Sequence, residues 1–234
     1  MSEEKKIEVM SLSYRLVHTH NLHFIAFLTI TGVILLLPNL FGWLAQAIGM
    51  PLATYLGTPP ESAGASLALV LHVAIGFLWG AMLILYALYL LYTRNIRVFD
   101  SLKKPLGKQI REAKALAGRY MLGKPIPPEV LEEMERHNVL VAYTFIILLV
   151  GVILVSISGV ALAFRNYLPV ETFRTMLLMH DVGFGLIMLF LLLHLYASLH
   201  PANRPVLHAM FTDGMMTIKE LEEHMKSYLK RFSK

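Results

Sequence analysis

Four long runs of apolar residues dominate the sequence and leave little choice of fold. Between His23 and Arg94 only Glu61 is charged, and residues 138–164 and 175–203 are almost free of charge. The runs 22–48, 66–93, 138–164 and 175–199 are each long enough for a helix to cross a hydrocarbon core, which takes about 20 apolar residues. Charged residues make up 16% of the chain, against about 25% in soluble domains. We therefore predict an all-α integral membrane protein, a four-helix bundle with a cytoplasmic loop and C-terminal amphipathic helices.

The basic residues predict how the chain is oriented. Of 21 Lys and Arg, three precede the first span, ten lie in the loop 94–137 and six follow the fourth span, which leaves only Arg165 and Arg174 on the other side. Because Lys and Arg accumulate in cytoplasmic loops, we expect a multi-pass protein of the cell inner membrane with both termini in the cytoplasm. Its parts are an N-terminal segment 1–21, a membrane domain 22–199 that includes the loop 94–137, and a tail 200–234. The net charge of +5 is a topology signal, so the expected surroundings are a lipid bilayer and no nucleic acid.

The segments outside the spans carry weaker signals. Pro38 predicts a kink or a stop near the outer end of the first span. The outer connection 49–64 is apolar, and it is either covered by another protein or lies on the lipid interface. In the loop, "KKPLGKQIREAKALAGRY" and "PPEVLEEMERHN" have helical stretches, with Pro127 and Pro128 suited to start the second. The amphipathic stretch "MTIKELEEHMKSYLKRF" is expected on the cytoplasmic membrane face or against the middle loop.

Histidines inside the spans are the chemical feature of the sequence. His180 and His194 are fourteen residues apart, which places them on one face of a helix and about 21 Å apart along its axis. In the predicted topology, His72 and His180 lie at the same depth near the outer side of the membrane. His18 and His194 lie at the same depth near the inner side. Neutral imidazole is a ligand for haem iron, and an unpaired polar ring in hydrocarbon is costly. Two bis-histidine sites, one near each side of the membrane, follow from the spacing.

Other readings of these histidines stay open. Each ring can instead bond a neighbouring helix or reach the interface. Zinc usually takes more than two protein ligands, and the only carboxylate nearby, Asp181, points about 100° away from His180. His20 and His23 compete with His18 for the inner site. The remaining histidines are expected to be solvated or to face lipid: His137, His200, His208 and His224.

Small and polar residues near the histidines each have two possible roles. Glycines on the spans can let a flat porphyrin approach the backbone, or they can let helices pack closely. These glycines are Gly32, Gly76, Gly151, Gly159 and Gly183. Asn138, at the inner mouth of the third span, is placed to hydrogen-bond a quinone carbonyl or to cap a helix. The chain has no cysteine, which excludes disulfides, thiolate-held iron–sulfur clusters and thioether-attached haem in this chain.

A set of motifs in order resembles a known family. The motifs are Arg15-x-x-His18 followed by "FLTITG", "LHVAIGF" in the second span, Asn138 through "SISG" to Gly159, and "RTMLLMH" with the step to "HLYASL" and then "PVLHAMFTDG". From about residue 12 to residue 225 the chain resembles the dihaem cytochrome b subunits that anchor periplasm-facing respiratory enzymes, above all the gamma subunit of formate dehydrogenase. The wider family includes cytochrome b subunits of nickel–iron hydrogenases and of thiosulfate or polysulfide reductases. The chain departs from the family pattern at Thr19, where an aromatic residue is usual, and at Ser158, where a threonine is expected.

The resemblance implies a function. It implies two haems b, the outer held by His72 and His180 and the inner by His18 and His194, with a menaquinone or ubiquinone site near Asn138. It also implies an iron–sulfur subunit and a catalytic subunit as partners, with this chain carrying electrons between them and the quinone pool. No nucleophile, acid pair or phosphate-binding loop is evident, so the chemistry on the primary substrate is expected in a partner. The rival hypotheses are a self-contained transmembrane dihaem reductase and a haem-free transporter or assembly protein.

Overall fold

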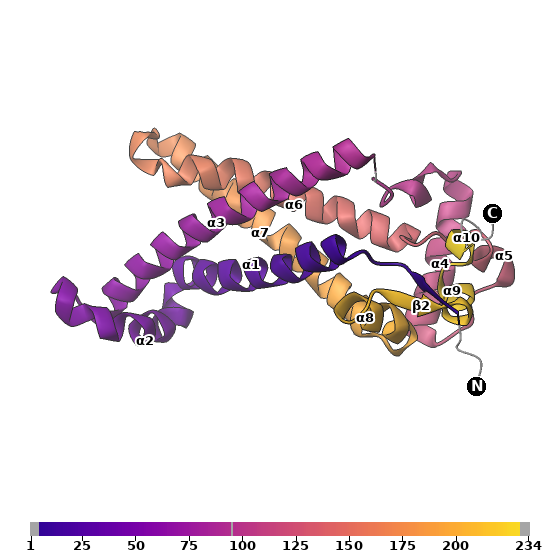
Figure 1. Ribbon diagram of the computed structural model, residues 1–234. Coiled ribbons are helices and arrows are strands. Elements are labelled where there is room, and N and C mark those ends of the chain that lie inside the picture. The colour runs from indigo at the N-terminus through magenta and orange to yellow at the C-terminus, as the bar shows by residue number, and fades with distance from the viewer. Residues whose placement is uncertain (1–4, 95, 230–234) are drawn as a thin grey trace. The chain divides into compact units, whose positions relative to one another are not determined.

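The computed structural model describes residues 5–94 and 96–229, and in these ranges the chain is mostly helical (Figure 1). Four helices are long and apolar enough to cross a membrane, as predicted: α1 (Leu12–Leu36), α3 (Pro60–Thr93), α6 (Val139–Ala163) and α7 (Val170–Leu199). The other helices are α2 (Pro38–Leu56), α4 (Leu106–Leu122), α5 (Pro128–Leu131), α8 (Arg204–Phe211), α9 (Ile218–His224) and α10 (Lys226–Leu229). Three short 3₁₀ helices are η1 (Asp100–Lys103), η2 (Arg165–Tyr167) and η3 (Pro201–Asn203). The predicted basic residues Lys230, Arg231 and Lys234 lie outside the described residues.

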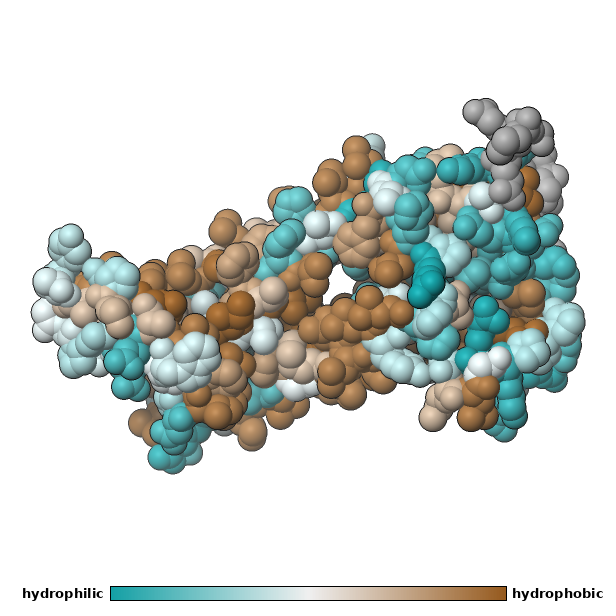
Figure 2. Space-filling view, turned by 90° about the horizontal axis from the view of Figure 1, so that it is seen from below, coloured by the Kyte–Doolittle hydropathy of each residue, from teal (hydrophilic) through white to brown (hydrophobic). Residues whose placement is uncertain are grey.

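The chain divides into two compact units, each described here by itself. Unit 1 comprises Met1–Arg15, Arg94–Ile157 and Leu177–Lys234, and unit 2 comprises Leu16–Thr93 and Ser158–Met176. Figure 2 shows apolar side chains over the long helices and polar ones gathered over the loop and terminal segments of unit 1. This segregation is the surface expected of helices in lipid with a polar part in water.

In unit 2, a proline separates the first span from a second helix. The prediction for Pro38 is confirmed: α1 ends at Leu36, and Pro38 is the first residue of α2, where a missing N–H is tolerated. The predicted range of the first span, 22–48, is wrong, because the helix begins earlier and the apolar residues after Pro38 belong to α2. Most of the outer connection is likewise helical, with α3 beginning at Pro60.

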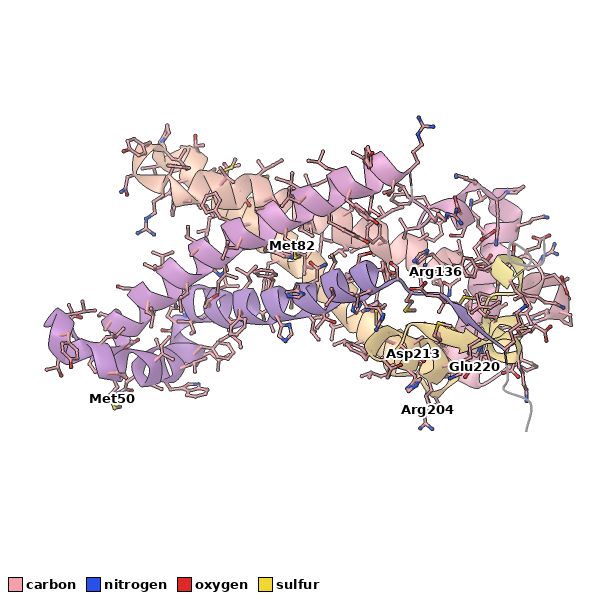
Figure 3. The ribbon with its side chains drawn as sticks, in the orientation of Figure 1. Met50, Met82, Arg136, Arg204, Asp213 and Glu220 are labelled. Carbon is pink, nitrogen blue, oxygen red and sulfur yellow. The ribbon has the colours of Figure 1, made fainter. Side chains whose placement is uncertain are left out.

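Small residues hold α2 against the start of α3. A Cβ added at Gly49 would lie 1.9 Å from the carbonyl oxygen of Pro60, and one at Gly64 would lie 1.8 Å from that of Ala45. The two backbones are therefore in contact, and the antiparallel hairpin cannot accept a side chain at either glycine. Met50, on α2, points away from α3 (Figure 3).

In unit 1, glycines also bring α6 and α7 together. A Cβ at Gly183 would lie 2.8 Å from Cγ1 of Val155 and 3.0 Å from the carbonyl oxygen of Gly151. Small residues let membrane helices approach closely and gain van der Waals contact. The interpretation that glycines allow close helix packing is therefore confirmed for Gly151 and Gly183.

Segments near the two ends of the chain pair in a small sheet that the sequence did not predict. Strand β1 (Lys6–Glu8) pairs antiparallel with β2 (Met215–Thr217), with Lys6 opposite Thr217. Gly214 precedes β2 with φ of 79°, and its carbonyl accepts from the N–H of Val9 at 2.8 Å. A Cβ at Gly214 would lie 2.2 Å from the carbonyl oxygen of Met10, so this turn requires glycine.

The loop and tail of unit 1 pack on each other. The expected start of the second loop helix is confirmed, since Pro127 caps α5 and Pro128 begins it. The amphipathic tail helix is broken at Met225 into α9 and α10. The N–H of Ser227 donates to the carbonyl of Met134 at 3.2 Å, which places the tail against the middle loop, one of the two positions that the sequence allowed.

Candidate functional site

The four predicted histidines lie on three of the apolar helices. His18 is on α1 and His72 on α3, both in unit 2, while His180 and His194 share α7 in unit 1. Each predicted pair therefore takes one member from each unit. All four side chains are half-buried. The helix α7 is unbroken between His180 and His194, so the two residues share one face of a continuous helix, as the sequence predicts.

His72 is held by a hydroxyl on the neighbouring helix. Its Nδ1 lies 2.9 Å from Oγ1 of Thr31, and that hydroxyl lies 2.8 Å from the carbonyl oxygen of Phe27. A carbonyl oxygen can only accept, so when the hydroxyl donates to Phe27, Oγ1 accepts from Nδ1 and His72 carries its proton there. The lone pair of this neutral imidazole is then on Nε2. Metal-binding histidines are usually fixed in this way, with the other ring N–H donated to an oxygen.

A glycine makes room for this ring. A Cβ at Gly32 would lie 3.3 Å from Cε1 of His72, closer than most carbon atoms approach. On the same face of α3 as His72, a Cβ at Gly76 would meet only Leu28, at 3.9 Å. The imidazole of His72 and the small residues beside it fit a histidine that binds the iron of a porphyrin.

The two histidines of α7 are packed against unlike neighbours. The ring of His180 hydrogen-bonds the backbone of Val155 on α6. The ring of His194 stacks on Phe190, with centroids 5.2 Å apart, and its Nε2 lies 3.5 Å from Oγ of Ser198, long for a hydrogen bond. His180 therefore has the same kind of support from a neighbouring helix as His72.

The histidines that compete with His18 are placed differently from it. His20 and His23 are exposed, and Nδ1 of His20 bonds the carbonyl of Leu16 on its own helix at 2.7 Å. His18 is half-buried on α1. Burial thus favours His18 of the three as the ligand from this helix.

Asn138 caps α6. Its Oδ1 accepts from the N–H of Val141 at 3.0 Å, and the N–H of Val139 donates to Oε1 of Glu112 at 2.9 Å. The predicted role of Asn138 as a helix cap is therefore confirmed. The amide nitrogen of Asn138 is a hydrogen-bond donor, the polarity that a quinone carbonyl needs.

The expectation that His137 is solvated or faces lipid is wrong for its ring nitrogen Nδ1. Its Nδ1 is buried and accepts or donates no hydrogen bond within residues 5–94 and 96–229. Burial, and next the cation of Arg136, lower the pKa of His137 to about 4. Arg136, labelled in Figure 3, itself lies over the ring of Tyr14 with 4.9 Å between its Cζ and the ring centroid. Arg136 and Tyr14 are far apart in the sequence, so no local pattern predicts their contact.

His200 and His224, which were also expected to be solvated or to face lipid, are half-buried and contact neighbouring segments. The ring of His200 lies edge-on to Tyr120, with centroids 5.2 Å apart. Nε2 of His224 lies 2.6 Å from the carbonyl oxygen of Ala202, which ties α9 to η3.

Comparison with known proteins adds the family. The prokaryotic cytochrome b561 family matches residues 9–213, a range that contains all four predicted histidines. No curated protein matches the chain. Since the match covers most of a chain with four spanning helices, the chain belongs to the prokaryotic cytochrome b561 family and is a membrane haem b protein of electron transfer.

Proposed function

We propose that the chain is the membrane-anchoring dihaem subunit of a respiratory oxidoreductase of the formate dehydrogenase type. It carries electrons between an iron–sulfur subunit docked on its outer face and the quinone pool, and the primary substrate is converted in a catalytic partner. The observation that carries this proposal is the environment of His72. An intramembrane imidazole whose Nδ1 is bonded to the hydroxyl of Thr31, beside the small Gly32, is oriented as metal-binding histidines usually are.

The proposal assigns four ligands. His72 and His180 hold one haem b, and His18 and His194 hold the other. Each haem b, when bound, supplies a one-electron carrier. His180 is supported from α6 as His72 is from α1, and such support fixes the orientation of a ligand ring and raises its basicity.

Asn138 is proposed to bind the quinone, menaquinone or ubiquinone. Its Oδ1 is engaged in capping α6, so the amide is held in place and its nitrogen is the atom that donates to a quinone carbonyl. The positive-inside rule places this end of α6 in the cytoplasm, where protons for the quinol are available. One electron moved across the membrane corresponds to about 2.3 kcal/mol per 100 mV.

Haem content tests the ligand assignment. A pyridine haemochrome assay on the purified full chain should find two haems b per chain. His72→Ala and His180→Ala should each remove one haem and leave the other, whereas His20→Ala should remove none. Loss of no haem from either of the first two variants would refute the outer pair.

Copurification tests the partner. The tagged chain, extracted in mild detergent, should bring down a subunit with the electron paramagnetic resonance signals of iron–sulfur clusters. A chain that holds two haems, purifies alone and is reduced by a cytoplasmic donor would instead be the self-contained reductase.

A further inference from the structure

Helix α4 divides its surface into three faces. Its buried face carries Gln109, Glu112 and Leu116. Beside it runs a stripe of apolar side chains that stay exposed: 64% for Leu106, 46% for Ile110 and 76% for Met121. The rest of the surface is basic and exposed, with Lys108, Arg111 and Lys114. The only acid of the helix, Glu112, has 4% of its side chain exposed and pairs with Lys104 at 2.6 Å. Lys108 pairs with Glu133 of the same loop at 2.6 Å, so the exposed charges that α4 adds beyond this pair are the cations Arg111 and Lys114.

Hydrogen bonds fix both halves of α4 to the ends of two spans. In its first half, Oε1 of Gln109 accepts from the hydroxyl of Tyr143 near the start of α6 at 2.7 Å. In its last turn, the carbonyl of Tyr120 accepts from the hydroxyl of Tyr196 near the end of α7 at 2.9 Å. All of these residues belong to unit 1, where Figure 1 shows α4 running crosswise to the end of α6. A helix tied at both ends to the same ends of two spans lies along the membrane surface.

The depth of α4 follows from its partners. Tyr143 and Tyr196 are each about one turn inside the span to which they belong, and tyrosine is enriched at the level of the lipid headgroups. The exposed stripe of α4 is therefore held beside the boundary between headgroups and acyl chains. An apolar stripe next to a Lys and Arg face is the pattern of a helix that lies in this boundary.

From this placement we propose that α4 is an interfacial helix that inserts Leu106, Ile110 and Met121 into the lipid leaflet and binds anionic lipid headgroups through Arg111 and Lys114. The phosphate-bearing surface of the leaflet is complementary to the exposed cations Arg111 and Lys114. The proposal goes beyond the haem sites and needs none of the histidines. It holds α4 at a fixed depth, and through Glu112 it steadies the first turn of α6.

The depth of the stripe is measurable because the chain has no cysteine of its own. Single variants Ile110→Cys and Met121→Cys of the full chain, labelled with a nitroxide, are reconstituted in vesicles of phosphatidylcholine with phosphatidylglycerol. The matched control is Lys219→Cys, an exposed position on α9. At positions 110 and 121 we expect collisions with oxygen, which dissolves in lipid, to exceed those with a water-soluble nickel chelate, and the reverse at position 219. Equal access of the chelate to all three positions would overturn the proposal.

The headgroup contact is tested by charge removal. Phosphatidylglycerol is titrated against the solubilised full chain and its binding read by native mass spectrometry. One Lys or Arg near an anionic surface is worth about a fivefold change in binding, so Arg111→Gln with Lys114→Gln should weaken the binding at least about fivefold. Lys5→Gln with Lys219→Gln removes the same charge at the corner where the carbonyl of Lys5 meets the N–H of Ile218, and should leave the binding unchanged. If both double variants weaken it equally, or neither does, α4 is not the headgroup site.

Discussion

At the scale of single residues, the spacing of histidines was visible in the sequence and their support was not. Fourteen residues between His180 and His194 predict a shared helix face whatever surrounds them. The bond from His72 to Thr31 joins residues 41 positions apart, and no pattern along the chain pairs them. The same holds for His137, which looks like a polar loop residue, while its Nδ1 is buried in the folded chain.

Thr31→Val should weaken the haem held by His72. Valine keeps the shape of threonine but accepts no hydrogen bond, so Nδ1 of His72 loses the oxygen that fixes its tautomer. Loss of such a supporting contact commonly costs about 10- to 100-fold in metal affinity. We expect haem loss from one of the two sites on dilution in detergent, read as the haemochrome ratio, together with a changed midpoint potential. Thr31→Ser keeps the hydroxyl and should behave as the unchanged protein. Equal haem retention in the valine and serine variants would argue that the bond has no such role.

His137 should make the stability of the protein depend on pH. Its pKa is lowered to about 4 in the folded chain, against about 6.5 when unfolded, because burial and Arg136 disfavour the charged ring. Its contribution is therefore full above pH 6.5 and is lost as the pH falls from 6.5 toward 4. The loss is at most about 3 kcal/mol. Melting temperatures in detergent, measured across this window, should fall less steeply for His137→Gln than for the unchanged chain, and parallel curves would count against the assignment.

At the scale of elements, hydrophobicity located the four spans but misplaced a boundary. The residues after Pro38 are as apolar as those before it, so a hydropathy pattern continues through them, while the structure ends α1 there and folds α2 back on α3. That choice depends on Gly49 and Gly64, whose value lies in contacts across the hairpin. The strands β1 and β2 were missed for a related reason, since each is three residues long and gains its partner from the opposite end of the chain.

Gly64→Ala should open the hairpin of α2 and α3. The added methyl group would lie 1.8 Å from the carbonyl oxygen of Ala45, so the helices must separate, and overpacking of this kind typically costs about 1–3 kcal/mol. Gly80→Ala on the same helix is the matched control, since nothing lies within 4 Å of its added Cβ. Thermal melting in detergent should show a lower midpoint for the first variant only. A drop of the same size in both would mean that the hairpin contact is not what Gly64 provides.

At the scale of the whole molecule, charge and apolar length act together to place the chain in the membrane. Helix length and composition are properties of the chain itself, and the structure bears out that four helices can span. The orientation of the chain is determined differently, because it is fixed during insertion into the membrane and follows the distribution of Lys and Arg among the loops. The sequence places 19 of 21 basic residues on one side of the spans, a bias strong enough for a definite prediction.

That orientation should be visible by labelling from outside the cell. Tyr55, at the end of α2, is 88% exposed. In the predicted orientation Tyr55 lies on the outer side and Lys219 on α9 lies on the inner side. In a chain without native cysteine, Tyr55→Cys should react with a membrane-impermeant maleimide in intact spheroplasts. Lys219→Cys should react only after the membrane is opened. Because both positions are exposed in the folded chain, a difference in labelling reports the membrane barrier rather than burial. The opposite pattern would invert the topology and place Asn138, with the proposed quinone site, on the periplasmic side, so this experiment also decides from which compartment the quinol takes its protons.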